Sequence, residues 1–69
     1  MTTLYPFQQR VVDERSDLDA KIKKLADFIV LSPIFKALPG DEKQRLYRQH
    51  AAMRAYSAVL GERIEAFTA

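Results

Sequence analysis

The sequence predicts an all-α protein, a long antiparallel helical hairpin with a short helical turn in its connector. Two segments carry apolar residues at intervals of three and four, which is the spacing of one helix face. A proline-containing stretch, LSPIFKALPG, separates them. No segment alternates β-branched with polar residues, so strands are not expected. We expect one domain over residues 1–69, with helices at about 4–30 and 41–67 and the turn at about 33–38.

The first helix is predicted by a proline and an apolar stripe. Pro6 suits the first helical turn, where a missing backbone N–H costs nothing, and Thr3 or Tyr5 would then lie at the cap. Apolar residues then recur at threes and fours along the segment. The stripe consists of Leu4, Phe7, Val11, Leu18, Ile22, Leu25 and Ile29.

The connector and the second helix carry their own start signals. Ser32 followed by Pro33 predicts the N-cap and the first residue of the short turn. Asp41, with Gln44 three residues on, predicts a capping box at the start of the second helix. The second apolar stripe alternates spacings of four and three, which favours lengthwise packing on another helix. It consists of Leu46, His50, Met53, Ser57, Leu60, Ile64 and Phe67.

Pairing the two stripes leaves apolar surface uncovered. Folding at the connector places Leu18 opposite Ser57, and the residues that then lie off the paired stripes are Tyr5, Val12, Phe28, Val30, Tyr47, Tyr56 and Val59. A chain of 69 residues buries little surface by itself, and without cysteine it has no disulfide to stabilise it. Small residues of the second helix, Gly61 among them, would let another backbone come close. We therefore expect a homo-oligomer.

The residue types argue against an enzyme, a cofactor or a metal site. No set of nucleophile, histidine and acid, and no glycine-rich phosphate loop, can be assembled from this sequence. The one histidine, His50, lies on the apolar stripe, which favours a hydrogen-bonded core histidine over a ligand. A net charge of +2 is too small to indicate DNA binding.

The sequence shows no membrane or export signal. No apolar run approaches the roughly 18 residues that a membrane span needs. The N-terminal stretch MTTLYPFQQR lacks the charged-then-apolar layout of a signal peptide. We expect a cytosolic protein, and the lack of cysteine agrees with this expectation.

The cations differ in their local partners. An acid four residues before a cation forms a helical ion pair, and this pattern is found at Lys21, Lys23 and Arg45, with Asp17, Asp19 and Asp41 respectively. It is missing at Lys24, Arg48, Arg54 and Arg63. These residues either form an ordinary solvated surface or, gathered by oligomer symmetry, bind an anionic ligand. A phosphate needs such donors, and a nucleobase needs an aromatic face.

Two aromatic residues are candidates for that face. Phe7 lies on the apolar stripe, so a core position is its favoured interpretation. Tyr5 lies off the stripe, which favours contact with another copy or stacking on a ligand.

Three motifs spread along the chain carry a family resemblance that covers nearly its whole length. They are Q-R-V-V-x-E, K-I-x-K-L-x-x-F-I and M-x-x-Y-x-x-x-L-x-x-R-I. In these motifs the chain resembles the helical-hairpin family of phage anti-CBASS and anti-Thoeris proteins, which act as cyclic-nucleotide sponges. The resemblance implies a compact homo-oligomer, typically a hexamer. Such an oligomer sequesters cyclic dinucleotides or trinucleotides (cGAMP-like) without cleaving them, in the host bacterial cytoplasm.

The resemblance also implies roles for individual residues. In the family, an aromatic near the start of the first helix stacks on the base, and a lysine further along meets the phosphate. The aromatic here would be Phe7 or Tyr5, and the lysine would be Lys24, Lys23 or Lys21. By the same analogy, Gln8 and Arg63 would line a second, threefold site for larger cyclic oligonucleotides.

Other functions remain open at this point. The off-stripe aromatics equally suit a protein-binding hairpin, a phage inhibitor or adaptor that docks on a host protein. Nucleic-acid binding ranks third, because the basic stretch is short and acids lie elsewhere along the chain. A purely structural role without a ligand is the fourth alternative.

Overall fold

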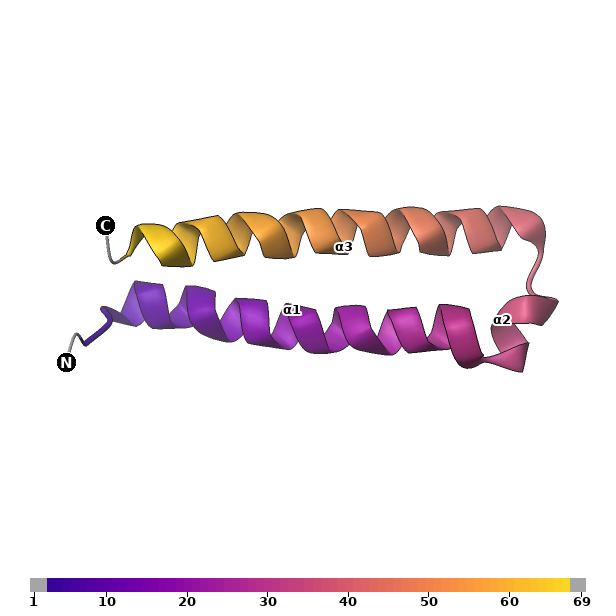
Figure 1. The fold of residues 1–69 in the computed structure, drawn as a ribbon, viewed down its shortest axis with the longest axis horizontal. Helices are drawn as coiled ribbons and strands as arrows, with labels where there is room; N and C mark the ends of the chain where they lie inside the picture. The colour runs from indigo at the N-terminus through magenta and orange to yellow at the C-terminus, as the bar shows by residue number, and fades with distance from the viewer. Residues whose placement is uncertain (1–2, 68–69) are drawn as a thin grey trace.

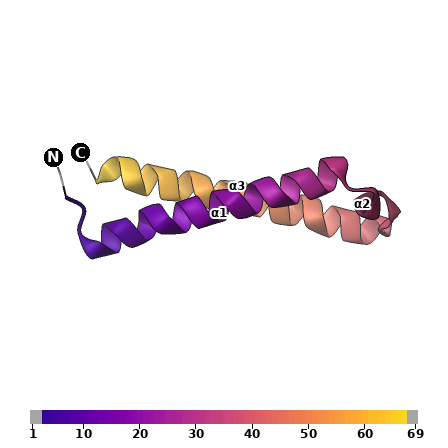
Figure 2. The same ribbon diagram turned by 90° about the horizontal axis from the view of Figure 1, so that it is seen from below.

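The computed structural model describes residues 3–67, which form three helices. These are α1 (Pro6–Leu31), α2 (Pro33–Ala37) and α3 (Gly40–Ala66). Helices α1 and α3 lie side by side and run antiparallel, and α2 lies at the end opposite the start of α1 and the end of α3 (Figure 1). Seen from below, the two long helices cross at a shallow angle (Figure 2). The molecule is a rod of 50 × 16 × 15 Å.

The predicted all-α class and the packed pair of long helices are confirmed. The helix bounds lie within two residues of those expected. The expected domain span of 1–69 includes residues 1–2 and 68–69, which lie outside the described residues.

Helix α1 begins after Tyr5, one of the two expected cap residues. Pro6 is the first helical residue, as predicted. The cap relies on a reverse contact, because the Gln8 side-chain oxygen accepts a hydrogen bond from the Tyr5 backbone N–H at 2.9 Å. The Gln8 amide thereby satisfies a donor that no intrahelical carbonyl reaches.

Ser32 joins the first two helices. Its backbone N–H donates the last helical hydrogen bond of α1, to the Phe28 carbonyl at 3.1 Å, and its extended backbone before Pro33 ends the helix. Its hydroxyl accepts from the Ile34 backbone N–H at 3.1 Å and so caps α2, with Pro33 as the first residue of that helix. The predicted cap at Ser32 is confirmed.

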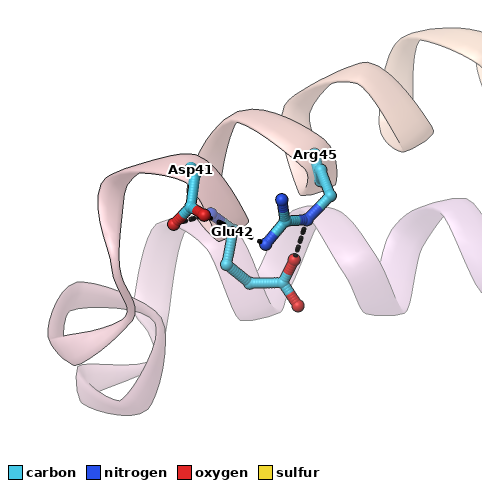
Figure 3. A network of polar contacts seen from close by, with 3 residues as sticks. All are labelled: Asp41, Glu42 and Arg45. Atoms are coloured by element: carbon cyan, nitrogen blue, oxygen red, sulfur yellow. Dashed lines mark hydrogen bonds and ion pairs between the residues drawn. The ribbon is translucent and has the colours of Figure 1, made fainter.

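The predicted cap of α3 is wrong. The N-cap is Pro39, and Asp41 lies inside the first turn, while Gln44 has no part in a capping box. The Asp41 carboxylate accepts from the Glu42 backbone N–H at 3.0 Å and lies 3.5 Å from an Arg45 nitrogen (Figure 3). The helix dipole favours acids in a first turn, so Asp41 contributes without being the cap.

The core is a narrow seam between the long helices. Its buried apolar members are Val11, Leu18 and Leu60, and Ile22, Met53, Ile64 and Phe67 pack against them partly buried. These residues belong to the two predicted stripes, so the antiparallel pairing of the stripes is confirmed. Leu60 is only 1% exposed, whereas most of the other members of the seam keep part of their surface accessible. A single pair of helices therefore buries little, as a chain of this size must.

A polar layer interrupts the seam at Ser57. The Ser57 hydroxyl donates to the Asp19 carboxylate at 2.5 Å and accepts from the Arg15 Nε–H at 3.5 Å. A Cβ added to Gly61 would lie 2.8 Å from the Arg15 guanidinium carbon. Gly61 thus makes room for Arg15 of the same chain. The expectation that this glycine admits another backbone is not needed to explain it.

Candidate functional site

The open end of the hairpin, where α1 begins and α3 ends (Figure 1), carries an aromatic group. The Tyr5 and Phe7 rings are parallel within 6°, with centroids 6.2 Å apart. Phe7 also meets the Phe67 ring edge-on, at 6.4 Å and 78°. Tyr5 is 67% exposed and Phe7 52%. The favoured core position of Phe7 is therefore wrong, since the seam at this end has too few neighbours to cover the ring.

Two arginines lie within one helical turn of the aromatic residues along the chain. Arg63 lies in the last turn of α3, four residues before its C-cap Phe67, and Arg10 lies one turn after Phe7 on α1. Both are exposed, and neither forms an ion pair with any described residue. Arg63 was singled out from the sequence, and Arg10 was missed. The same signal marks Arg10, because Pro6 and not an acid lies four residues before it.

The Gln8 side chain stabilises the first turn of α1, next to the rings of Tyr5 and Phe7. Its amide oxygen is engaged by the Tyr5 backbone N–H, which fixes the turn that carries both rings. The Gln8 residue is half-buried, and its amide nitrogen donates to no described residue. The amide N–H₂ is therefore available as a donor to a bound molecule.

The three candidate lysines lie elsewhere on α1. Lys21 and Lys24 are fourteen and seventeen residues beyond Phe7, which is about 21 and 26 Å along a helix that rises 1.5 Å per residue. All three are exposed, and Lys23 pairs with Asp27 at 3.4 Å instead of with Asp19. One chain therefore brings Tyr5, Phe7, Gln8 and Arg63 to one end but does not bring the lysines to them.

Two hollows lie along the seam. The larger, of about 470 Å³, is lined by Arg10, Asp13, Glu14, Asp17, Leu18, Lys21 and Tyr56. Its three carboxylates outnumber its two cations, which disfavours a polyanion there. The smaller, of about 270 Å³, is lined by Arg15, Asp19, Ile22, Arg54, Ser57 and Ala58. Its acid and Arg15 are already engaged through Ser57.

A second aromatic cluster closes the connector end. The ring of Phe35, which is 5% exposed, meets Phe28 and Tyr47 edge-on at 5.9 and 5.6 Å. The Lys43 ammonium lies 5.8 Å from the centroid of Phe35. Phe28 and Tyr47 were expected to be left over for another copy, but both already pack on Phe35. Exposed apolar residues at this end are instead Val30, Leu31 and Ile34.

We searched the described residues for a metal site, for hydrogen bonds of His50 and for a membrane-spanning helix. Residues 3–67 contain no cluster of three or more His, Cys, Asp or Glu side chains that could hold a metal ion. His50 is half-buried but makes no hydrogen bond with another described residue, so the expected hydrogen-bonded core histidine is not found. None of α1, α2 and α3 is both long and apolar enough to cross a membrane.

Comparison with protein families decides the class of this hairpin. A family model described as Sequestin matches residues 5–66. The chain belongs to the Sequestin family. The expected membership of a family of sequestering proteins is thereby confirmed, and the name denotes binding rather than catalysis. No curated protein and no solved structure matches this Sequestin chain.

The matched segment covers the whole hairpin. It begins at Tyr5 and ends at Ala66, so it contains α1, α2 and α3 entirely. Tyr5, Phe7 and Arg63 of the aromatic end lie within it, and Phe67 lies one residue beyond it.

Proposed function

We propose that this Sequestin protein binds a cyclic oligonucleotide immune second messenger and holds it uncleaved in the host bacterial cytoplasm. CBASS-type antiphage signalling is thereby blocked, because the messenger does not reach its effector. The single observation that carries the proposal is the exposed, stacked pair of Tyr5 and Phe7 at the end of the hairpin that also carries Arg10 and Arg63, two cations without an ion-pair partner among the described residues.

The chemistry of this end suits a nucleotide. A base stacks on an exposed aromatic face whatever its sequence, and such a contact stabilises a complex by about 1–3 kcal/mol per base. Arginine donates paired, charge-assisted hydrogen bonds to a phosphate. The N–H₂ group of Gln8 lies on the same turn and adds a neutral donor. Base and phosphate contacts thus come together within one end of the hairpin.

Self-association belongs to the same proposal. Tyr5 is 67% exposed at the end that a ligand would occupy, and one rod only 15–16 Å across cannot enclose a cyclic dinucleotide. A ligand bound at one end of the rod needs a second protein surface to enclose it, and another copy of the chain supplies that surface. A homo-oligomer meets this need, and the family resemblance implies that the oligomer is a hexamer. In it, a lysine from Lys21, Lys23 or Lys24 reaches a phosphate only if a neighbouring copy contributes it.

The test is recovery of the messenger. Purified protein is mixed with cyclic di- and trinucleotides, freed of unbound ligand, and denatured by heat. Chromatography of the supernatant should then show the bound cyclic nucleotide intact and in amounts stoichiometric with the protein. Linear or hydrolysed product would contradict sequestration, and no retained nucleotide would contradict binding.

A second candidate function rests on a different surface. Val30, Leu31 and Ile34 are 68%, 72% and 67% exposed at the connector end, and they form an apolar tip. Such a tip suits docking on a host protein. An Ile34→Asp variant separates the two functions, because it removes tip docking but leaves cyclic nucleotide binding at the opposite end unchanged.

A further inference from the structure

One side of α1 carries charges in an ordered sequence. Its members recur at threes and fours and therefore share a helix face: Arg10, Asp13, Glu14, Asp17, Lys21 and Lys24. The acids lie in the N-terminal half of this face and the two lysines in the C-terminal half. All but Lys24 line the larger hollow beside Tyr56. We call these six residues the charged face.

The charges of this face have no ion-pair partners among the residues that the structure describes. Within residues 3–67 the expected helical pair of Asp17 with Lys21 is not formed, and Lys24 has no ion-pair partner. From the described residues Asp13 accepts one neutral hydrogen bond, from the Gln9 amide at 3.0 Å. Acids and lysines on one face are thus available to a partner.

We propose that the charged face is the contact between two copies of the chain, related by a twofold axis, with α1 antiparallel to α1 of the partner. A reversed copy places lysines opposite acids, and the twofold repeats each pairing. Asp13 and Glu14 then face the partner's Lys24, and Asp17 faces the partner's Lys21. The order of charge along one helix face makes the surface complementary to itself.

Tyr56 lies at the centre of this contact. The hydrogen bond between Ser57 and Asp19 places this part of α3 level with Asp19, between the acids and the lysines of α1. Tyr56 is 46% exposed and lines the hollow. On the twofold axis its ring meets the partner's Tyr56. A central aromatic contact surrounded by charges is the usual anatomy of a specific interface.

Other arrangements of the same face bring like charges together. Parallel copies in register place acid on acid and lysine on lysine. An antiparallel register that brings Phe7 to the partner's Lys24 places Glu14 opposite the partner's Asp17. Like-charge contacts of this kind suppress a pairing. The charged face therefore gives Lys21 and Lys24 a role in assembly. Arg10 lies at the N-terminal end of this face and meets no acid of the partner's charged face in this register, so it stays available for a phosphate, as does Arg63 outside the face.

This inference deepens the self-association part of the proposed function and rests on it, but it does not depend on the identity of the ligand. The two are separated by measuring oligomer state in the absence of any nucleotide. If the protein self-associates through the charged face but binds no nucleotide, the proposed ligand is contradicted and the proposed interface is supported.

The experiment reverses the charges in two complementary variants. Asp13→Lys with Asp17→Lys makes the face predominantly positive, and Lys21→Glu with Lys24→Glu makes it predominantly negative. Alone, each variant should self-associate about 100-fold more weakly than wild type, because like charges meet. Mixed at equal concentrations, they should form a 1:1 complex of wild-type stability, because opposite charges meet again. Sedimentation equilibrium measures all three samples, and circular dichroism shows that each variant is helical.

A matched control carries the same change of charge elsewhere. Lys36→Glu with Arg48→Glu alters exposed cations that lie outside the charged face and form no ion pair with a described residue. This variant should self-associate as wild type does. The proposal is overturned if wild type is monomeric, if the two charge variants still self-associate alone, or if their mixture stays dissociated. Tyr56→Ala should weaken association in the wild-type background, and an unchanged association constant would remove Tyr56 from the interface.

Discussion

The ring of Phe7 meets the ring of Phe67 edge-on, with centroids 6.4 Å apart, and this contact joins the start of α1 to the end of α3. Edge-to-face pairs of this kind stabilise by about 0.5–1.5 kcal/mol beyond their buried area. The contact holds the open end together and still leaves Phe7 52% exposed. One aromatic residue thus closes the hairpin and offers a face to a ligand.

Replacement of the two aromatics should separate these roles. Tyr5→Ala removes an exposed ring that stacks on Phe7, so it should weaken nucleotide binding by about 1–3 kcal/mol and leave the melting temperature unchanged. Phe7→Ala removes the contact with Phe67 as well, so it should lower both affinity and melting temperature. Calorimetric titration and thermal unfolding measure the two effects. Equal loss of stability in both variants would contradict the assignment of Tyr5 to the ligand.

The arginines of the open end should determine phosphate binding. Arg63→Ala and Arg10→Ala should each weaken cyclic nucleotide binding by about ten- to hundredfold, the usual effect of a lost hydrogen bond to a charged group. Arg48→Ala is the control, since Arg48 is an exposed cation of α3 far from Phe7. An equal loss in the control would show that net charge, rather than these two side chains, governs affinity.

Leu60 should dominate the stability of the seam. It is the most deeply buried side chain described, at 1% exposure. Leu60→Ala should lower the free energy of unfolding by about 2–5 kcal/mol, because transfer energy and packing are both lost. Gln44→Ala, on the exposed side of α3, should change it by about 0.5 kcal/mol or less. Urea unfolding of the two variants at matched concentration measures the difference, and equal midpoints would contradict the seam.

Gly61 should tolerate alanine despite its buried position. The added Cβ would lie 2.8 Å from the end of the flexible Arg15 side chain, which can move aside and lose its contact with Ser57. Alanine favours a helix interior over glycine by about 1 kcal/mol, which offsets that loss. Gly61→Ala should therefore unfold within about 1 kcal/mol of wild type. Thermal or urea unfolding measures the change, and a loss above about 2 kcal/mol would show that Arg15 is held in place.

The hairpin itself could be predicted from periodicity, because a helix that packs on one neighbour must carry its apolar residues at threes and fours. Val11, Leu18 and Leu60 were found in this way. Local start signals were less reliable. Ser32 caps as its sequence predicts, whereas Asp41 does not, because Pro39 already supplies the extended residue before the first turn.

The site could be predicted only in part. Periodicity shows which residues share a helix face, but it does not show where along that face the neighbouring helix ends. Phe7 belongs to the apolar stripe, yet it is half-exposed because the hairpin ends beside it. The ion pairs likewise depend on rotamers. Lys23 pairs forward with Asp27, since Asp19 is engaged by Ser57 and Arg15. Spacing alone allowed either partner.

Sequestration itself is tested by calorimetric titration of the wild-type oligomer with a panel of cyclic di- and trinucleotides. We expect saturable binding of at least one member of the panel. This binding should be lost in a Tyr5→Ala/Arg63→Ala double variant that keeps the wild-type oligomer state and melting temperature. Absence of heat with every member, for a folded and oligomeric wild-type protein, would contradict sequestration of a cyclic nucleotide.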